Sequence, residues 1–307
     1  MTHLRYAAIL SFIIVLLASC RKDADEPTPD APMPTGTGQS LDVTGSVITS
    51  SGAPLASASV DCNGISTTTD SRGVFRLRSV PVHEGPNFVR VRKSGYYNGG
   101  RIFHGFGDED VAVKVKLLPK VQIGSFQASA GGTVSGSDGV VVTIPANGIA
   151  NGYQGTVRVF ATYIDPSSSI GISPIPGMDA RNAAGDGGVL LSYGMANIEL
   201  EDGSGNPLQL ATGSLAQLTL PIPSSFQVDA PDDIPLWYFD ETAGYWREEG
   251  IAQRQGESYV GEVAHFTTWN CDILESGQGE GCPVRLQVRI ACDGEPYAYL
   301  PVYVEYR

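Results

Sequence analysis

Histidines and carboxylates are the residues from which a hydrolytic zinc site would be built in this chain. Such a site needs three protein ligands, with patterns such as His-x-x-Glu or His-Glu-x-x-His, and a fourth position open to water. Beyond residue 19 the histidines are His83, His104 and His265, and none has a glutamate three positions later. His83 is followed by Glu84 but has no second histidine four positions after it. The sequence therefore predicts no metal ligands and no zinc peptidase activity.

Serine and phosphate chemistry are not supported by the sequence either. The Gly-x-Ser-x-Gly elbow of many hydrolases is absent. Ser19 to Lys22 matches Ser-x-x-Lys, but Ser19 belongs to a segment that we expect to be removed. The glycines at 277, 279 and 281 have neither a preceding strand nor a following helix, so they form a linker and not a phosphate loop. We therefore expect no catalytic residue, no cofactor and no enzymatic activity.

The five cysteines have different expected roles. Cys62 lies on the same strand face as Val60 and is expected to be a buried free thiol. Cys282 and Cys292 lie on one extended segment, up to roughly 30 Å apart, which is too far for a disulfide. Cys271 could instead form a disulfide with either Cys282 or Cys292, and an exported compartment permits that bond. The alternative is that Cys271 stays reduced.

Two further groups of residues are candidates for ligand binding. The acidic runs 108–110 and 229–233 could bind calcium, but neither has the alternating ligand pattern of a calcium loop, so solvated loops are the favoured interpretation. Trp237, Tyr245 and Trp246 could form a carbohydrate-stacking surface. Packing in a β-sheet core is the favoured interpretation of these aromatic residues.

The first 20 residues have the organisation of a lipoprotein signal peptide. His3 and Arg5 precede an apolar run that ends at Ala18 and is shorter than the roughly 20 residues of a membrane-spanning helix. Residues 17–20, Leu-Ala-Ser-Cys, resemble the bacterial lipobox, which implies removal of residues 1–19 and lipidation of Cys20. Two or three acyl chains would hold the protein stably on a membrane. The alternative is a membrane-spanning anchor with an incidental cysteine.

Residues 20–40 are predicted to be a flexible tether behind that lipid. Four prolines between residues 27 and 34 hold such a segment extended, at about 3 Å per residue. The cluster from Lys22 to Glu26 resembles the acidic export signal of surface-exposed lipoproteins in the Bacteroidetes. An ordinary solvated linker is the alternative.

Composition predicts an all-β protein with an acidic surface. The chain has 37 glycines and 20 prolines among 307 residues, and only 17% of its residues are charged, which favours short strands and tight turns. No segment beyond the signal shows a sustained helical period of apolar residues. The net charge of −13 disfavours binding to nucleic acid. The chain is long enough for two domains and part of a third.

Residues 41–119 predict a first β-sandwich. Alternating apolar positions indicate strands through Val43 and Val47 and through Val60, joined by a turn at 50–54. A hairpin-like unit around the turn 68–73 and strands near 88–91 and 111–118 follow. This span resembles the carboxypeptidase regulatory-like domain, a small prealbumin-like sandwich that accompanies a catalytic domain without being one. The matching residues are Gly45, Val47, Gly52, Pro54, Leu55, Ala58, Val60, Thr69, Asp70, Gly73, Phe75, Gly95 and Tyr96.

Residues 120–270 predict a second, larger β-sandwich, with strands at 140–145, 155–163, 189–200 and 215–222 and an aromatic hairpin at 235–250 whose first strand is central. Its Ile-Pro-Ala start, Leu-Trp-Tyr-Phe-Asp segment and His-Phe-Thr element resemble the extracellular part of astroprincin-type proteins and, more weakly, the Ig-like β-sandwich of ankyrins and netrin receptors.

In residues 271–307, the spacing of Gly294, Pro296 and Val302 repeats that of Gly52, Pro54 and Val60. This repeat predicts the start of a second regulatory-like domain that is truncated at Arg307; a terminal hairpin packed on the middle domain is the alternative.

Together these features predict tandem β-sandwiches in a non-catalytic lipoprotein of the cell envelope. We expect anchoring to the outer membrane with exposure at the cell surface, where the domains would serve adhesion, structural display or binding of a protein or glycan. One alternative is the accessory part of an envelope hydrolase or carboxypeptidase-like protein. Another is a periplasmic scaffold for an outer-membrane transporter.

Overall fold

The described part of the protein is built almost entirely of β-strands, which confirms the all-β prediction. The computed structural model describes residues 39–83, 85–104, 110–168 and 171–275. All of these residues belong to one compact unit of the chain. None of the described segments forms a helix with the length and apolar character required to cross a bilayer.

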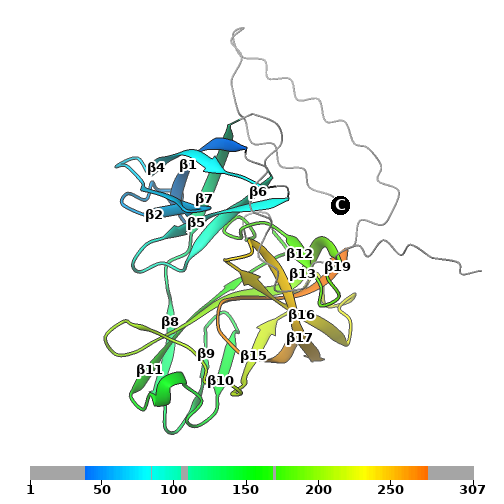
Figure 1. The fold of residues 1–307 in the computed structure, drawn as a ribbon. Helices are drawn as coiled ribbons and strands as arrows, with labels where there is room; N and C mark the ends of the chain where they lie inside the picture. Colours follow the sequence, from blue (N-terminus) through cyan, green and yellow to red (C-terminus); the bar gives the residue numbers. More distant parts are fainter. Residues whose placement is uncertain (1–38, 84, 105–109, 169–170, 276–307) are drawn as a thin grey trace, which may run out of the picture. The chain divides into compact units, whose positions relative to one another are not determined.

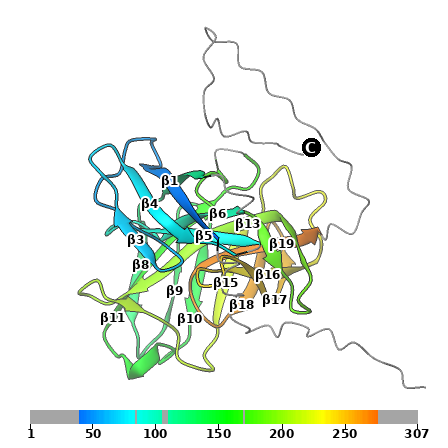
Figure 2. The ribbon, with the colours of Figure 1, turned by 45° about the horizontal axis from the view of Figure 1, so that its top comes forward.

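The first domain is a sandwich of two small sheets (Figures 1 and 2). In one sheet β1 pairs antiparallel with β4 and parallel with β7. The other sheet is antiparallel and has the order β3-β2-β5-β6. The strands are β1 Ser40–Thr49, β2 Ser59–Cys62, β3 Ile65–Thr68, β4 Val74–Pro81, β5 Pro86–Arg92, β6 Gly99–His104 and β7 Val111–Leu117.

Alternating residues of these strands fill the core between the two sheets. Val43 and Val47 of β1 are completely buried, as are Val60 of β2 and Val89 of β5. Cys62 is 1% exposed in the same core and is a free thiol, which confirms its predicted role. Apolar alternation therefore predicts the buried face of each strand correctly, because successive side chains of a strand point to opposite faces.

The predicted pairing of the second strand unit, however, is wrong. The turn at 68–73 joins β3 of one sheet to β4 of the other, so these strands do not form a hairpin. The turn at 50–54 likewise connects β1 to β2 across the sandwich. Both strands of each unit still bury one face in the common core. The alternation pattern is therefore the same for a hairpin and for a crossing between sheets.

Gly45 lies where β1 is held between its two neighbouring strands. A Cβ atom on Gly45 would lie 2.4 Å from the carbonyl oxygen of Val113 and 2.6 Å from the Cζ atom of Phe75. We expect Gly45→Val to lower the free energy of unfolding by about 1–3 kcal/mol or more, because such overpacking displaces the backbone. Denaturant unfolding followed by circular dichroism measures this. Ser46→Val, on the next residue of the strand, is the control and should change stability by about 0.5 kcal/mol or less.

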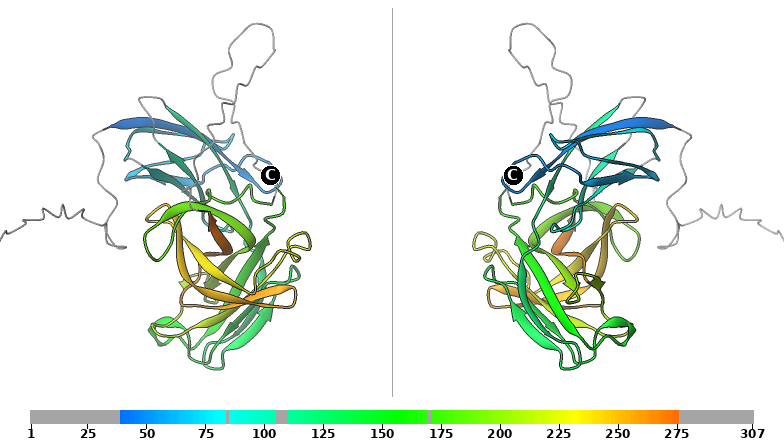
Figure 3. Two further views of the ribbon diagram at one scale, coloured as in Figure 1. Left: turned by 90° about the vertical axis from the view of Figure 1, so that its right-hand side faces the viewer. Right: turned by 90° about the vertical axis from the view of Figure 1, so that its left-hand side faces the viewer.

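The second domain is one long sheet that folds back on itself (Figure 3). Its strand order is β8-β11-β13-β19-β16-β17-β18-β15-β10-β9, with β12 and β14 pairing at the side. The two end strands pack together, since a Cβ atom on Gly124 of β8 would lie 2.5 Å from Cγ1 of Val134 in β9. The elements are β8 Gln122–Gln127, β9 Gly132–Ser135, β10 Val141–Ile144, the short 3₁₀ helix η1 Ala150–Gly152, β11 Thr156–Ile164, β12 Asp179–Arg181, β13 Gly187–Glu201, β14 Pro207–Leu208, β15 Ala216–Pro221, β16 Asp233–Asp240, β17 Tyr245–Gln255, β18 Ser258–Val263 and β19 Thr268–Glu275.

The strand predicted to be central is central in the structure, and the second domain extends past residue 270, its predicted end. The strand β16 lies between β19 and β17, as the apolar residues on both of its faces predict. The strand β19 pairs with β13 as far as Glu275, so the second domain continues past residue 270. The rest of the expected partial domain, residues 276–307, lies outside the described residues.

The two faces of β13 pack against different parts of the protein. Ala196, Ile198 and Leu200 point into the core of the second domain. Met195, which directly precedes Ala196, points to the opposite face and joins a second apolar cluster. That cluster also contains Phe88 and Ile102 of the first domain, together with Trp237, Phe239 and Trp246. One face of this sheet therefore forms a core shared with the first domain.

Candidate functional site

Beside the shared core, polar residues of both domains line a pocket of about 190 Å³. Tyr97 and Asn98 precede β6 of the first domain, and Asn197 and Glu199 lie on β13 of the second. The polar lining consists of Tyr97, Asn98, Asn197, Glu199, Gln209, Glu241, Thr267 and Thr268. This volume is smaller than that of most small-molecule sites, so the pocket fits a single ring or one end of a longer ligand.

Two polar groups of the pocket have hydrogen-bonding capacity to spare. Asn98 is exposed, and within the described chain its side-chain amide makes no hydrogen bond. The Glu241 carboxylate has a distant ion pair with Arg90, at 3.7 Å. In contrast, Gln209 is occupied by the backbone of Phe266, accepting from its N–H at 2.9 Å and donating to its carbonyl oxygen at 2.8 Å. An amide offers donors and an acceptor, and a carboxylate offers acceptors only.

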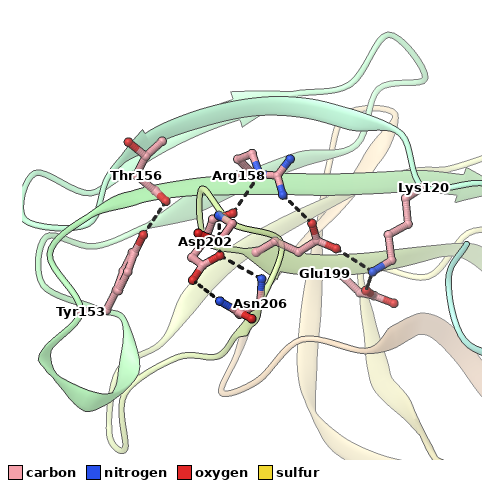
Figure 4. A network of polar contacts seen from close by, with 9 residues as sticks. Lys120, Tyr153, Thr156, Arg158, Glu199, Asp202 and Asn206 are labelled. Carbon is pink, nitrogen blue, oxygen red and sulfur yellow. Dashed lines mark hydrogen bonds and ion pairs between the residues drawn. The ribbon is translucent and has the colours of Figure 1, made fainter. Parts of the chain in front are cut away.

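A charged network adjoins the pocket, and Glu199 belongs to both the network and the pocket lining (Figure 4). Glu199 and Glu201 are two residues apart on β13 and therefore point to the same face. Lys120 Nζ lies 2.5 Å from Glu199 Oε2 and 2.8 Å from Glu201 Oε1. Arg158, opposite Glu201 in the ladder between β11 and β13, lies 2.8 Å from the other oxygen of Glu201. Two cations thus balance two carboxylates in a largely buried position.

Burial affects the acid and the base of this network differently. It raises the pKa of Glu199, and the hydrogen bond and charge of Lys120 only partly oppose that shift. Burial by itself would lower the pKa of Lys120, but hydrogen bonds to Glu199 and Glu201 more than compensate and raise it. Lys120 is therefore held in its charged form.

Tyr97, one of the residues that line the pocket, joins the two domains. Its hydroxyl accepts hydrogen bonds from Thr162 Oγ1 at 3.3 Å and from the backbone N–H of Val121 at 3.4 Å. The side chain is 2% exposed, and burial raises its pKa to about 12. Tyr97 thus contributes to positioning and not to proton transfer near neutral pH.

A second polar cluster, formed by Ser192 of β13 with Asn270 and Asp272 of β19, was not predicted from the sequence. Ser192 Oγ donates to Asn270 Oδ1 at 2.5 Å, and Asn270 Nδ2 donates to Asp272 Oδ2. Asn270 and Asp272 are completely buried, and Asp272 Oδ1 has no hydrogen-bond partner among the described residues. Burial raises the pKa of Asp272 well above its usual range, and the Ser192 hydroxyl opposes that shift. The only sequence signal was the two polar residues Asn270 and Asp272, which alternate with the apolar residues Trp269, Cys271 and Ile273.

Comparison with known proteins identifies the first domain. The family model of the carboxypeptidase regulatory-like domain matches residues 42–117. Residues 42–117 form a carboxypeptidase regulatory-like domain. This agrees with the two-sheet sandwich and with the resemblance inferred from the glycine and apolar spacing. No curated protein matches the chain.

Three solved structures are similar to the chain at low identity. A 3-chlorocatechol 1,2-dioxygenase from Rhodococcus opacus is 17% identical with a TM-score of 0.23; the match covers 29% of this chain and 63% of that one, which is less than two thirds. A candidate membrane-associated protein of unknown function from Bacteroides fragilis is 9% identical with a TM-score of 0.21, and the match covers 76% of this chain and 98% of that one. A candidate carbohydrate binding protein from Bacteroides uniformis is 11% identical with a TM-score of 0.19, covering 75% of this chain and 100% of that one. TM-scores this low carry no functional argument.

The aromatic residues considered for a stacking surface are part of the core. Trp237, Tyr245 and Trp246 are 1%, 7% and 0% exposed. The indole N–H of Trp237 donates to the carbonyl oxygen of Asp272 at 3.0 Å, and that of Trp246 donates to Gly177 at 2.7 Å. This burial agrees with the favoured interpretation, packing in a β-sheet core, and not with the alternative of a stacking surface. Aromatic residues on both faces of a central strand are buried on both faces.

Among the described residues Cys271 forms no disulfide, and the bond considered above to Cys282 or Cys292 stays a prediction. Cys271 is 1% exposed and lies on the face of β19 that points into the core of the second domain. Burial, with a smaller contribution from the charge of Asp272, raises its pKa well above the usual range. Its two candidate partners, Cys282 and Cys292, and the lipidation site Cys20 lie outside the described residues.

The histidines and acidic runs are dispersed. His104 Nε2 lies 3.0 Å from Asp179 Oδ1, and His265 Nε2 lies 3.4 Å from Glu249 Oε2, so the two histidines have separate carboxylate partners. Asp110 accepts a hydrogen bond from the backbone of Asp42 at 3.1 Å, while residues 108 and 109 lie outside the described residues. Within the described chain no three His, Cys, Asp or Glu side chains converge on a possible metal position.

Proposed function

We propose that the chain is a non-catalytic binding module displayed at the bacterial cell surface, anchored by lipid at Cys20, with its ligand site in the polar pocket between Tyr97 and Glu199. The observation that carries the ligand site is that both domains contribute to one concave polar surface with hydrogen-bonding groups to spare. Support for the anchor and for display is the lipobox at residues 17–20 and the proline-rich tether behind it.

The chemistry of the pocket favours a neutral ligand rich in hydroxyl groups, such as one sugar ring of a glycan. Asn98 can donate and accept hydrogen bonds, and Glu241 can accept them, which matches hydroxyl groups that do both. The charges of Glu199 are already balanced by Lys120, so the wall of the pocket does not select strongly for a cation. Thr267 and Thr268 also line the pocket; their hydroxyls donate to Phe239 O and Asn197 Oδ1, and each can still accept a hydrogen bond from a ligand.

Calorimetric titration with purified envelope polysaccharides and a panel of free monosaccharides tests the pocket. Asn98→Ala and Glu241→Ala should each weaken binding about 5- to 70-fold, because a hydrogen bond to a neutral or charged group contributes about 1–2.5 kcal/mol. Matched controls are Gln253→Ala and Glu262→Ala, exposed residues outside the pocket lining. Binding that is unchanged in both pocket variants, or a panel in which no probe binds, would contradict the assignment.

A further inference from the structure

Ser192, Asn270 and Asp272 lie outside the pocket lining, and together they have the functional groups needed for an intramolecular cross-link. Ser192 and Asp272 are directly opposite each other in the ladder between β13 and β19. Asn270 lies two residues before Asp272 and points to the same face. A hydroxyl, a carboxamide and a carboxyl group from two adjacent strands are therefore in mutual hydrogen-bonding contact.

From this geometry we propose that Ser192 and Asn270 join in an intramolecular ester cross-link between β13 and β19, with Asp272 transferring the proton. Ser192 Oγ is within 2.5 Å of the Asn270 carbonyl oxygen, next to the carbon that it would attack. Asp272 contacts the Asn270 nitrogen, which is the leaving group. Nucleophile, electrophile and proton-transfer group are thus placed before any reaction begins, which is the main requirement for an intramolecular reaction.

The reaction balances without a cofactor. Ser192 Oγ forms a bond to Cγ of Asn270, and the bond from Cγ to Nδ2 breaks. The hydroxyl proton of Ser192 passes through the Asp272 carboxyl group to Nδ2, which leaves as ammonia. No electron transfer takes place. Ser192 is only partly buried, so ammonia has a route to solvent, and its dilution makes the step irreversible.

The surroundings favour proton transfer by Asp272. Leu190, Met195 and Trp237 lie on the same face and belong to the apolar cluster shared by the domains. Burial there favours the protonated carboxyl, while Asp272 Oδ1, without a partner in the described structure, can take up or release a proton. A buried, unpaired carboxyl group costs stability unless it is neutral or performs a function.

A second hydroxyl and amide pair in the same ladder serves as an internal comparison. Thr268 Oγ1 lies 2.5 Å from Asn197 Oδ1, which is the same contact distance. Among the contacts of the described residues, no carboxyl group hydrogen-bonds to that pair. If proton transfer by an acid is required, the cross-link forms between Ser192 and Asn270 and not between Thr268 and Asn197.

Intact mass spectrometry of the full-length protein, followed by peptide mapping, tests the proposal. The expected mass deficit relative to the unlinked chain is about 17 Da, the mass of one ammonia. After digestion, the peptides that contain Ser192 and Asn270 should be joined, and hydroxylamine should separate them because it cleaves esters. If the intact mass equals that of the unlinked chain and the peptides with Ser192 and Asn270 are found separately, the proposal is overturned.

Variants assign the roles within the site. Ser192→Ala, Asn270→Ala and Asp272→Ala should each restore the full mass expected for its composition, whereas Thr268→Val should keep the deficit. In a denaturing gel the wild type should migrate faster than these three variants, because the cross-link closes a loop from β13 to β19. A deficit that persists in Ser192→Ala would also overturn the proposal, since the lost ammonia would then come from another site.

Discussion

Replacing Trp237 by alanine is expected to lower the free energy of unfolding by about 3–5 kcal/mol, the usual cost of removing a large aromatic side chain from a core. Trp237 is 1% exposed on the central strand β16 and belongs to the cluster shared with Phe88 and Ile102 of the regulatory-like domain. Its indole N–H also satisfies the backbone carbonyl of Asp272. The substitution should therefore destabilise both domains, and the two should unfold together in one transition.

Urea denaturation followed by circular dichroism, with a domain-specific protease digest as second probe, measures this effect. Ile251→Ala is the control, because Ile251 lies on the neighbouring strand β17 but is 64% exposed, and its substitution should cost about 0.5 kcal/mol or less. A Trp237→Ala protein that loses less than about 1 kcal/mol, or in which the regulatory-like domain unfolds unaffected, would contradict a shared core.

Replacing Lys120 by methionine is expected to cost about 2–4 kcal/mol at neutral pH, because removal of one partner leaves buried charges uncompensated. Lys120 Nζ bridges Glu199 and Glu201, and the three side chains are 19%, 28% and 14% exposed. Methionine keeps most of the volume of the lysine stem, so the loss reports on charge. Lys120→Arg should retain most of the stability.

The pH dependence of this variant gives a second, independent measurement. Burial raises the pKa of Glu199 above its usual 4.5 in the folded state, so its contribution to stability is complete below that value and is lost as pH rises through the folded pKa. Without Lys120, which opposes this shift, the pKa of Glu199 is raised further. The deficit of Lys120→Met relative to wild type should therefore be greater at pH 7.5 than at pH 5.

Unfolding measured at both pH values distinguishes this mechanism from a packing defect, for which the deficit would be the same at both. Arg72→Met is the matched control. The Arg72 side chain is 81% exposed and pairs with Asp70 at 3.4 Å, so its loss should change stability by less than about 0.5 kcal/mol at either pH.

The sequence predicted strands and their buried faces better than it predicted their partners. Alternation around Val43, Val60 and Phe75 placed each residue in the core correctly, since the period of a strand is a local property. The sheet to which each strand belongs depends on contacts far away in the chain, and the expected hairpin around residues 68–73 therefore failed.

The candidate site was harder to predict because it lies between elements that are distant in sequence. Trp237 and Trp246 were considered for ligand binding, but the first domain covers the face of the sheet on which they lie. Asn98 and Glu241 are ordinary polar residues in the sequence, and only the fold brings them into one pocket. Asn270 and Asp272 have no motif spacing, and their chemistry becomes visible only when β13 places Ser192 beside them.

Protease treatment of intact cells that produce the full-length protein is the most direct test of display at the cell surface. Detection of the region 41–270 before and after digestion, with a periplasmic marker protein as control, shows whether this region is exposed at the cell surface or lies in the periplasm. The proposed function predicts that the two β-domains are digested without lysis, and that Cys20→Ser releases the protein from the membrane fraction. Protection of both domains until the cells are lysed would contradict surface display and would favour a periplasmic role.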